Sequence, residues 1–244
     1  MELFSHVNRL KTVPPRKAAL VTSASFAAIG PFYFLASNAV AQLLHPNVNP
    51  IAITVSFLVF GHYGWIQTSA FYILGVSFIA LAAALIIKIN SKLNFGAIVV
   101  FLIGVCFILV AGNHVQSPGT IITLSEKIHR DSAIAIVVMS PIACFLLAPS
   151  LKASGHRGLW IYSIITGAIA VLTVVVGFLI PTAHADFLGI FERILLLNGQ
   201  VWGEIICLRL IWTAFKSKPA QTGPNSSLLR LLQIWVNSQP AEEQ

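Results

Sequence analysis

Three polar side chains follow one line along an apolar segment near the C-terminal end of the chain. Arg193, Gln200 and Glu204 are separated by seven and four residues, and Cys207 continues the line. A helix turns by about 100° per residue, so the three polar groups fall within about 20° of one another. Polar and charged groups inside an apolar segment are expected to face other helices or a wet cavity. We therefore predict that Arg193, Gln200 and Glu204 belong to a binding site.

A second cluster has residue types suited to acid–base chemistry. His129 and Asp131 begin another apolar segment, and Glu192 precedes Arg193 in the first one. We expect an ion pair between the two segments, either Asp131 with Arg193 or Arg130 with Glu192. Two interpretations stay open. In one, His129, Asp131 and Glu192 are catalytic acid–base groups of an outward-facing site; in the other, these charges clamp two helices together at a membrane boundary.

Gln67 lies near the start of a further apolar segment. We include it among the candidate binding residues, although an interhelical hydrogen bond is the more common role of such a side chain.

Several other chemistries lack their sequence signature. The closest two histidines, His114 and His129, are fifteen residues apart, so no helix carries a zinc-binding pair. A metal site assembled from separate helices stays open, but we expect neither a metal nor a cofactor. There is no G-x-S-x-G motif and no phosphate-binding glycine loop. Ser132 stands next to Asp131 and near His129, but neighbours on one helix do not have the geometry of a catalytic triad.

The composition excludes a water-soluble globule. Only 9% of the 244 residues are charged, from 15 Lys and Arg and 8 Asp and Glu, and 57% are hydrophobic. Ordinary soluble domains have about 25% charged and roughly 45–50% apolar residues. Disorder is excluded as well, because it requires few apolar residues and much charge. The remaining class is an all-α, polytopic integral membrane bundle.

Six apolar segments are long enough, or nearly so, for the roughly 20 residues that a spanning helix needs. They are residues 18–44, 65–87, 95–111, 131–149, 159–180 and 187–215. A seventh run, residues 51–60, is too short to span and predicts an interfacial or re-entrant segment. The chain then divides into a basic N-terminus (1–17), a six-helix transmembrane domain (18–215) and a tail (216–244) with a short amphipathic helix at 228–236. Cleavage of the first segment as a signal peptide is the weaker alternative, because this segment is long and contains Gly30-Pro31.

Basic residues predict the orientation, because Lys and Arg are retained on the cytoplasmic side of a membrane. Eleven lie on one predicted side: Arg9, Lys11, Arg16, Lys17, Lys88, Lys92, Lys152, Arg157, Lys216, Lys218 and Arg230. Lys127, Arg130 and Arg193 lie on the other. Both termini should therefore be cytoplasmic, and the protein should lie in the cell (plasma or inner) membrane. Five of the seven histidines and four of the eight acidic residues fall on the outer side, so we expect a polar site that opens outward.

Three short motifs, in this order, resemble a known family. They are Gly64-Trp65-Ile66-Gln67 followed by Phe71 and Gly75, then His129 at the start of the fourth segment, then Gly189-Ile190-Phe191-Glu192-Arg193 leading to Trp202. Together they look like the multipass membrane family catalogued as domain of unknown function 998. The resemblance covers roughly residues 18–215. It implies a six-helix integral membrane fold, mainly prokaryotic, and implies no activity.

Three functions remain open from the sequence. The first is a membrane protein that binds a lipid or small amphiphile in its outward-facing polar site. The second is a lipid-modifying hydrolase or transferase that uses His129, Asp131 and Glu192. The third is a proton-coupled transporter of small molecules in which Glu204 takes up the proton. Membrane lipids are the expected partners and no nucleic-acid surface is expected, while the sequence leaves protein partners open.

Overall fold

Six long helices dominate the computed structural model, which describes residues 15–89, 94–116, 121–179 and 181–216. They are α1 (Pro15–Leu44), α2 (Gly64–Lys88), α3 (Phe95–Gly112), α4 (Leu124–Ala153), α5 (Arg157–Leu179) and α6 (Pro181–Lys216). All six are long and apolar enough to cross a membrane, and the described residues contain no strand. The prediction of an all-α multipass bundle is therefore confirmed. The predicted tail helix at 228–236 lies outside the described residues.

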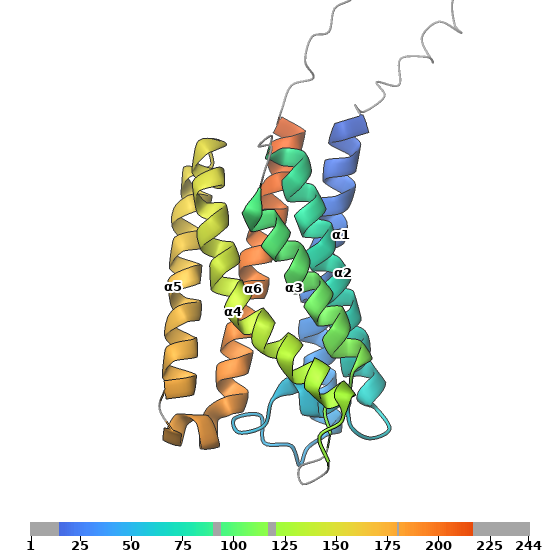
Figure 1. Cartoon of the computed structure of the whole chain (residues 1–244). Coiled ribbons are helices and arrows are strands. Elements are labelled where there is room, and N and C mark those ends of the chain that lie inside the picture. Colours follow the sequence, from blue (N-terminus) through green and yellow to red (C-terminus); the bar gives the residue numbers. More distant parts are fainter. Residues whose placement is uncertain (1–14, 90–93, 117–120, 180, 217–244) are drawn as a thin grey trace, which may run out of the picture. The chain divides into compact units, whose positions relative to one another are not determined.

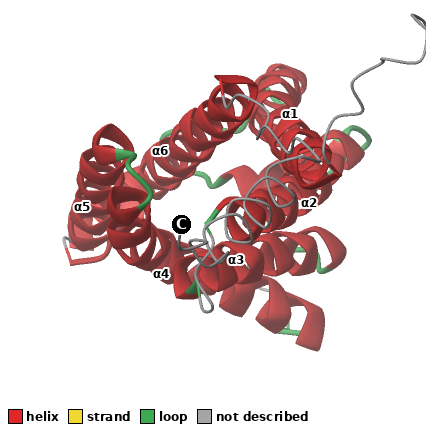
Figure 2. Ribbon diagram, turned by 90° about the horizontal axis from the view of Figure 1, so that it is seen from above, coloured by secondary structure: helices red, strands yellow, loops and turns green. Residues whose placement is uncertain are grey.

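The helices form a closed ring in the order of the sequence (Figures 1 and 2). Each of α1 to α4 packs against the helix that follows it. Seen from above, α6 lies between α5 and α1 and completes the ring (Figure 2). Contacts divide the chain into the units Met1–Ala214 and Phe215–Gln244, and all the packing described here belongs to the first unit. We call the end of the ring that carries the connection from α1 to α2 the loop end, and the opposite end the basic end.

Of the helices that begin before the predicted residue, α4 and α6 differ most, by seven and six residues. The fourth begins at Leu124 instead of residue 131, because the Thr123 side chain caps it by accepting a hydrogen bond from the Glu126 N–H at 3.3 Å. Thr at the cap and Glu three residues later is a known helix-start pattern. The sixth begins at Pro181 instead of residue 187, and proline is tolerated in a first turn because that turn needs no N–H donor.

The short apolar run at residues 51–60 does not span. It makes a turn and then the 3₁₀ helix η1 (Val55–Val59), in which Val55, Ser56 and Leu58 are buried. This segment contacts α1 and α2 at the loop end. The run is therefore non-spanning, as predicted, and its interfacial or re-entrant position stays a prediction.

Small residues let neighbouring helices approach closely. A Cβ at Gly75 of α2 would lie 2.8 Å from the Gly104 oxygen of α3, and a Cβ at Gly104 would lie 2.7 Å from the Gly75 oxygen. Such reciprocal contacts are typical of membrane helices, where association depends on close packing instead of on water exclusion.

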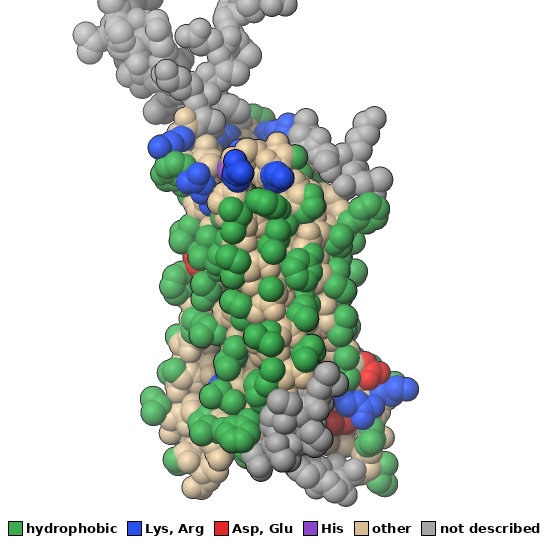
Figure 3. Space-filling model, turned by 90° about the vertical axis from the view of Figure 1, so that its left-hand side faces the viewer, with side chains coloured by type: hydrophobic (Ala, Val, Ile, Leu, Met, Phe, Trp, Pro, Cys, Tyr) green, Lys and Arg blue, Asp and Glu red, His purple; other side chains and the backbone are tan. Residues whose placement is uncertain are grey.

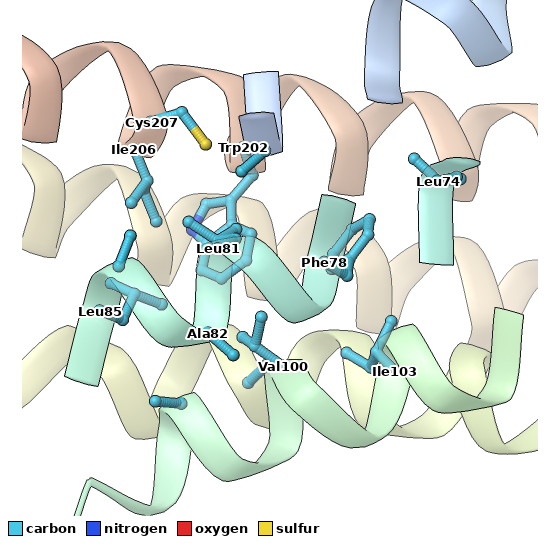
Figure 4. Close-up of a cluster of buried hydrophobic side chains, with 14 of the residues drawn as sticks. Leu74, Phe78, Leu81, Ala82, Leu85, Val100, Ile103, Trp202, Ile206 and Cys207 are labelled. Carbon is cyan, nitrogen blue, oxygen red and sulfur yellow. The ribbon is translucent and has the colours of Figure 1, made fainter. Parts of the chain in front are cut away.

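The interior of the ring is filled mainly by apolar side chains of α2, α3 and α6 (Figure 4). Trp202 of α6 is 2% exposed, and its indole N–H donates to the Ser163 hydroxyl of α5 at 3.0 Å. Large hydrophobic side chains also cover the outside, as the face in Figure 3 shows. On this face Lys and Arg side chains gather at the basic end, above the apolar band, and a second group lies beside acidic side chains at the loop end (Figure 3). An apolar exterior between polar ends is the surface that a bilayer requires.

Candidate functional site

Arg193 of α6 binds the connection between α1 and α2. Its Nη1 donates to the carbonyl oxygens of Pro50 at 2.7 Å, Ile53 at 2.8 Å and Gly189 at 3.1 Å. Its Nη2 donates to Oε1 of Gln42 at 3.1 Å. Nη1 carries two N–H groups for three acceptors, so one of these N–H groups is shared between two carbonyl oxygens. The expected ion pair with Asp131 is wrong, because Arg193 is occupied by these oxygens.

The residues around Arg193 hold the same connection. The Ile190 N–H donates to the Ile51 oxygen at 2.9 Å, and the Val55 N–H donates to Oε2 of Glu192 at 2.6 Å. A Cβ at Gly189 would lie only 2.3 Å from the Ile53 oxygen, so glycine allows the close approach. We call residues 50–55 the clamped segment. The motif Gly189 to Arg193 therefore fixes the start of η1.

The expected pair of Arg130 with Glu192 is also wrong. Among the described residues, the ion pair of Arg130 is with its neighbour Asp131, at 3.8 Å, and both side chains are more than half exposed. Asp131 therefore lies on the surface, away from the buried acid–base groups that the sequence analysis grouped with it.

His129 is buried at the loop end and has a defined tautomer. Its Nδ1 lies 2.6 Å from the Asn113 oxygen and 3.1 Å from the Val110 oxygen. Carbonyl oxygens only accept, so Nδ1 carries the hydrogen and Nε2 of the neutral ring is an acceptor. Nε2 lies 3.1 Å from Oγ of Ser56, which donates to it. The two side chains are 4% and 7% exposed.

A cavity of about 240 Å³ opens beside this pair. Its polar lining residues are Thr54, Ser56, Glu126, His129, Arg130 and Glu192, with Thr173 of α5. The other lining residues are apolar and come mainly from α4, α5 and α6: Val115, Ala133, Ile134, Val137, Val174, Gly177, Leu188, Phe191 and Leu195. Along α4 the lining changes from polar at Glu126, His129 and Arg130 to apolar at Ala133, Ile134 and Val137, so the cavity is amphipathic.

Two smaller cavities continue from the first one toward the middle of the ring. The second, of about 60 Å³, shares Ser56, Val137 and Glu192 with the first. The third, of about 20 Å³, shares Phe78 and Gly199 with the second. The three spaces adjoin one another because they share walls.

Gln200 marks the inner end of the second cavity. It lines this cavity and is 2% exposed, and neither its amide oxygen nor its amide nitrogen has a hydrogen-bond partner within the described part of the chain. A buried amide without partners is costly, since it has lost its bonds to water. It is therefore available to a polar group of a bound molecule.

The remaining predicted binding residues lie elsewhere. Gln67 is fully buried, and its Oε1 accepts from Nδ2 of Asn38 at 3.5 Å, a contact between α2 and α1. Both carboxylate oxygens of Glu204 are buried and have no hydrogen-bond partner among the described residues. Neither side chain is among those that line the three cavities. The polar line of α6 is thus divided: Arg193 holds the loop, Gln200 lines a cavity, and Glu204 is separate from both.

Ser56 is the residue that sequence reasoning missed. The signal was weak: Thr54 and Ser56 are the polar positions in the run Ile51 to Phe60. Nothing local shows that a hydroxyl there meets a histidine on another helix. For metals, no group of three or more His, Cys, Asp or Glu side chains that could hold an ion occurs in the described ranges.

One known family model matches most of the chain. The family model described as "Protein of unknown function (DUF998)" matches residues 28–209, and the chain belongs to this family. The matched region contains the three motifs that carried the resemblance, including Gly189 to Arg193. No curated protein and no solved structure matches the chain.

Proposed function

We propose that this membrane protein binds an amphiphile, with an apolar chain in the main cavity and a polar head at the loop end. The carrying observation is the lining of one cavity of about 240 Å³, which along α4 changes from polar residues at the loop end to apolar ones, and which is mainly apolar on α5 and α6. Each methylene group removed from water contributes about 0.8 kcal/mol, so a chain in this space binds favourably.

The charges at the loop end favour a polar head over a bare hydrocarbon. Arg130 can pair with an anionic group, and Glu126 and Glu192 offer carboxylates to a cationic one or to hydroxyl donors. Glu192 already accepts from Val55 through Oε2, which leaves part of its accepting capacity for a ligand. A zwitterionic head group and a head group that carries only hydroxyl groups both fit this arrangement.

A pair of neighbouring substitutions tests the proposal. Val137 lines the first two cavities, whereas Val138 is 51% exposed on the outside of the same helix. The protein is reconstituted in lipid nanodiscs and exposed to lysophosphatidylcholine with a photoreactive diazirine in its acyl chain. We expect crosslinks in α4, α5 and α6 at cavity-lining residues. Val137→Phe should lower them about tenfold, because the phenyl ring takes space from the acyl chain and excluding about two methylene groups costs roughly 1.6 kcal/mol, and Val138→Phe should not.

Two results would contradict this proposal. One is a crosslink pattern confined to lipid-facing residues such as Val138. The other is equal labelling of the two variants at the cavity residues. Thermal unfolding of both variants confirms that the comparison is made between folded proteins.

A further inference from the structure

Ser56 and His129 have the arrangement of a nucleophile and its general base. The Ser56 hydroxyl lies 3.1 Å from Nε2 of His129, within the range of about 2.6–3.2 Å that such pairs show. Both side chains are more than nine-tenths buried, and both line the main cavity. We propose that Ser56 is the nucleophile of an acyl-transfer site that cleaves carboxylic esters of amphiphiles bound in this cavity. This inference rests on the proposed function.

The third member of the arrangement is a backbone carbonyl. In serine hydrolases a carboxylate usually accepts from Nδ1–H and fixes the tautomer that leaves Nε2 free as a base. Here the Asn113 oxygen, at 2.6 Å, has that position, and the Val110 oxygen supports it at 3.1 Å. The ring is therefore oriented toward Ser56 by α3 and the residues that follow it, without a charged partner.

The contacts of Glu192 and Arg193 with the clamped segment explain how Ser56 reaches His129. Ser56 is the second residue of η1, directly after Val55, whose N–H is held by Glu192. Arg193 fixes the chain two to five residues earlier, at Ile53 and Pro50. A serine on an otherwise irregular connection is thereby placed against a rigid helix, as a nucleophile requires.

The chemistry balances with water as the co-reactant. His129 Nε2 takes the proton of the Ser56 hydroxyl while Oγ forms a bond to the ester carbonyl carbon. The bond from that carbon to the alcohol oxygen then breaks, and the alcohol leaves with the proton from His129. Water attacks the resulting acyl-serine by the same route, releases the fatty acid and restores both side chains. The acyl chain lies in the apolar part of the cavity, and the alcohol lies at the loop end.

A fluorophosphonate with a long alkyl chain tests the nucleophile directly. The probe forms an Oγ–P bond while its P–F bond breaks and fluoride leaves, so it marks activated serines. We expect the protein in nanodiscs to be labelled at Ser56, as located by peptide mass spectrometry. His129→Gln keeps a donor and an acceptor but no strong base, and should slow the labelling about a hundredfold or more. Ser132→Ala is the matched control, since Ser132 is 6% exposed and near His129 in sequence but is not among the cavity-lining residues.

The outcomes separate the two proposals. Labelling of Ser56 that depends on His129 supports the dyad. An unlabelled Ser56, or labelling of another serine, overturns it, and this result needs no variant that might misfold. If the diazirine lipid still crosslinks to the cavity in that case, amphiphile binding survives and only the chemistry fails. If neither probe reaches the cavity, both proposals fail.

Discussion

Two side chains at the loop end, Arg193 and His129, bind backbone carbonyl oxygens, although the sequence predicts an ion pair with Asp131 for Arg193 and acid–base chemistry for His129. The reason is the irregular chain at the loop end, which has carbonyl groups without helical partners. Near a bilayer such groups must be satisfied within the protein. Arg193 binds the oxygens of Pro50 and Ile53, and His129 binds those of Val110 and Asn113. The polar side chains here mainly bind backbone groups. The Ser56 hydroxyl differs, because it lies against a side-chain base, Nε2 of His129.

Glu204 supplies a prediction at this scale. Its carboxylate oxygens are buried without partners, and unpaired buried polar groups destabilise a fold by about 1–3 kcal/mol. Glu204→Leu should therefore raise the thermal unfolding temperature in detergent. Glu126→Leu is the comparison, because the Glu126 carboxylate accepts from the Gln116 N–H and its loss should lower the temperature. A destabilised Glu204→Leu protein would show that this carboxylate has a partner in the folded state.

At the scale of elements, the start of η1 is fixed by α6 and not by its own sequence. The contacts come from Gly189, Ile190, Glu192 and Arg193, within little more than one helical turn. Glycine is needed there because the carbonyl oxygens of the clamped segment lie where a side chain would be. The motif Gly189 to Arg193 therefore has a physical role, which is to hold the clamped segment against α6.

A matched pair of glycines on α6 tests whether Gly189 lets α6 hold the clamped segment. Gly189→Ala places a Cβ 2.3 Å from the Ile53 oxygen and 2.7 Å from the Pro50 oxygen, so the segment must shift. We expect a loss of about 1–3 kcal/mol in unfolding free energy, as for overpacking, and slower fluorophosphonate labelling. A Cβ at Gly199 meets nothing within 4 Å, so Gly199→Ala should be neutral or stabilising by about 0.5–1 kcal/mol. Equal unfolding curves for the two variants would show that the segment is not held at Gly189.

At the scale of the whole molecule, the ring has two chemically different ends. The basic residues predict that the loop end, with the polar residues of the cavity, faces away from the cytoplasm. Single cysteines test this orientation in intact cells with a membrane-impermeant maleimide. His62→Cys, on an exposed residue of the loop end, should react from outside, and Ser154→Cys, exposed between α4 and α5, should react only after permeabilisation. The reverse pattern would invert the predicted topology. The native cysteines Cys144 and Cys207 are buried, and Cys106 is partly buried.

The sequence by itself determined the membrane class and the number of helices. A run of apolar residues is a local property, so length and composition were enough to find all six spans, with the largest errors at the starts of α4 and α6. Local capping and proline chemistry caused those errors, and Thr123 with Glu126 was a readable signal. The sequence also identified His129, Glu192 and Arg193 as residues of interest, because ionisable groups are rare in such a chain.

Only the tertiary structure decided which of these residues meet. The contact between Ser56 and His129 joins positions 73 residues apart, and Arg193 reaches 140 residues back to Ile53. Helical periodicity tells which side chains share a face, but not which neighbour that face meets or how an irregular connection folds over it. Many hydrogen-bond partners at the loop end are backbone atoms, and the residue types of a sequence do not predict such partners. The three polar groups of α6, Arg193, Gln200 and Glu204, therefore have three different surroundings.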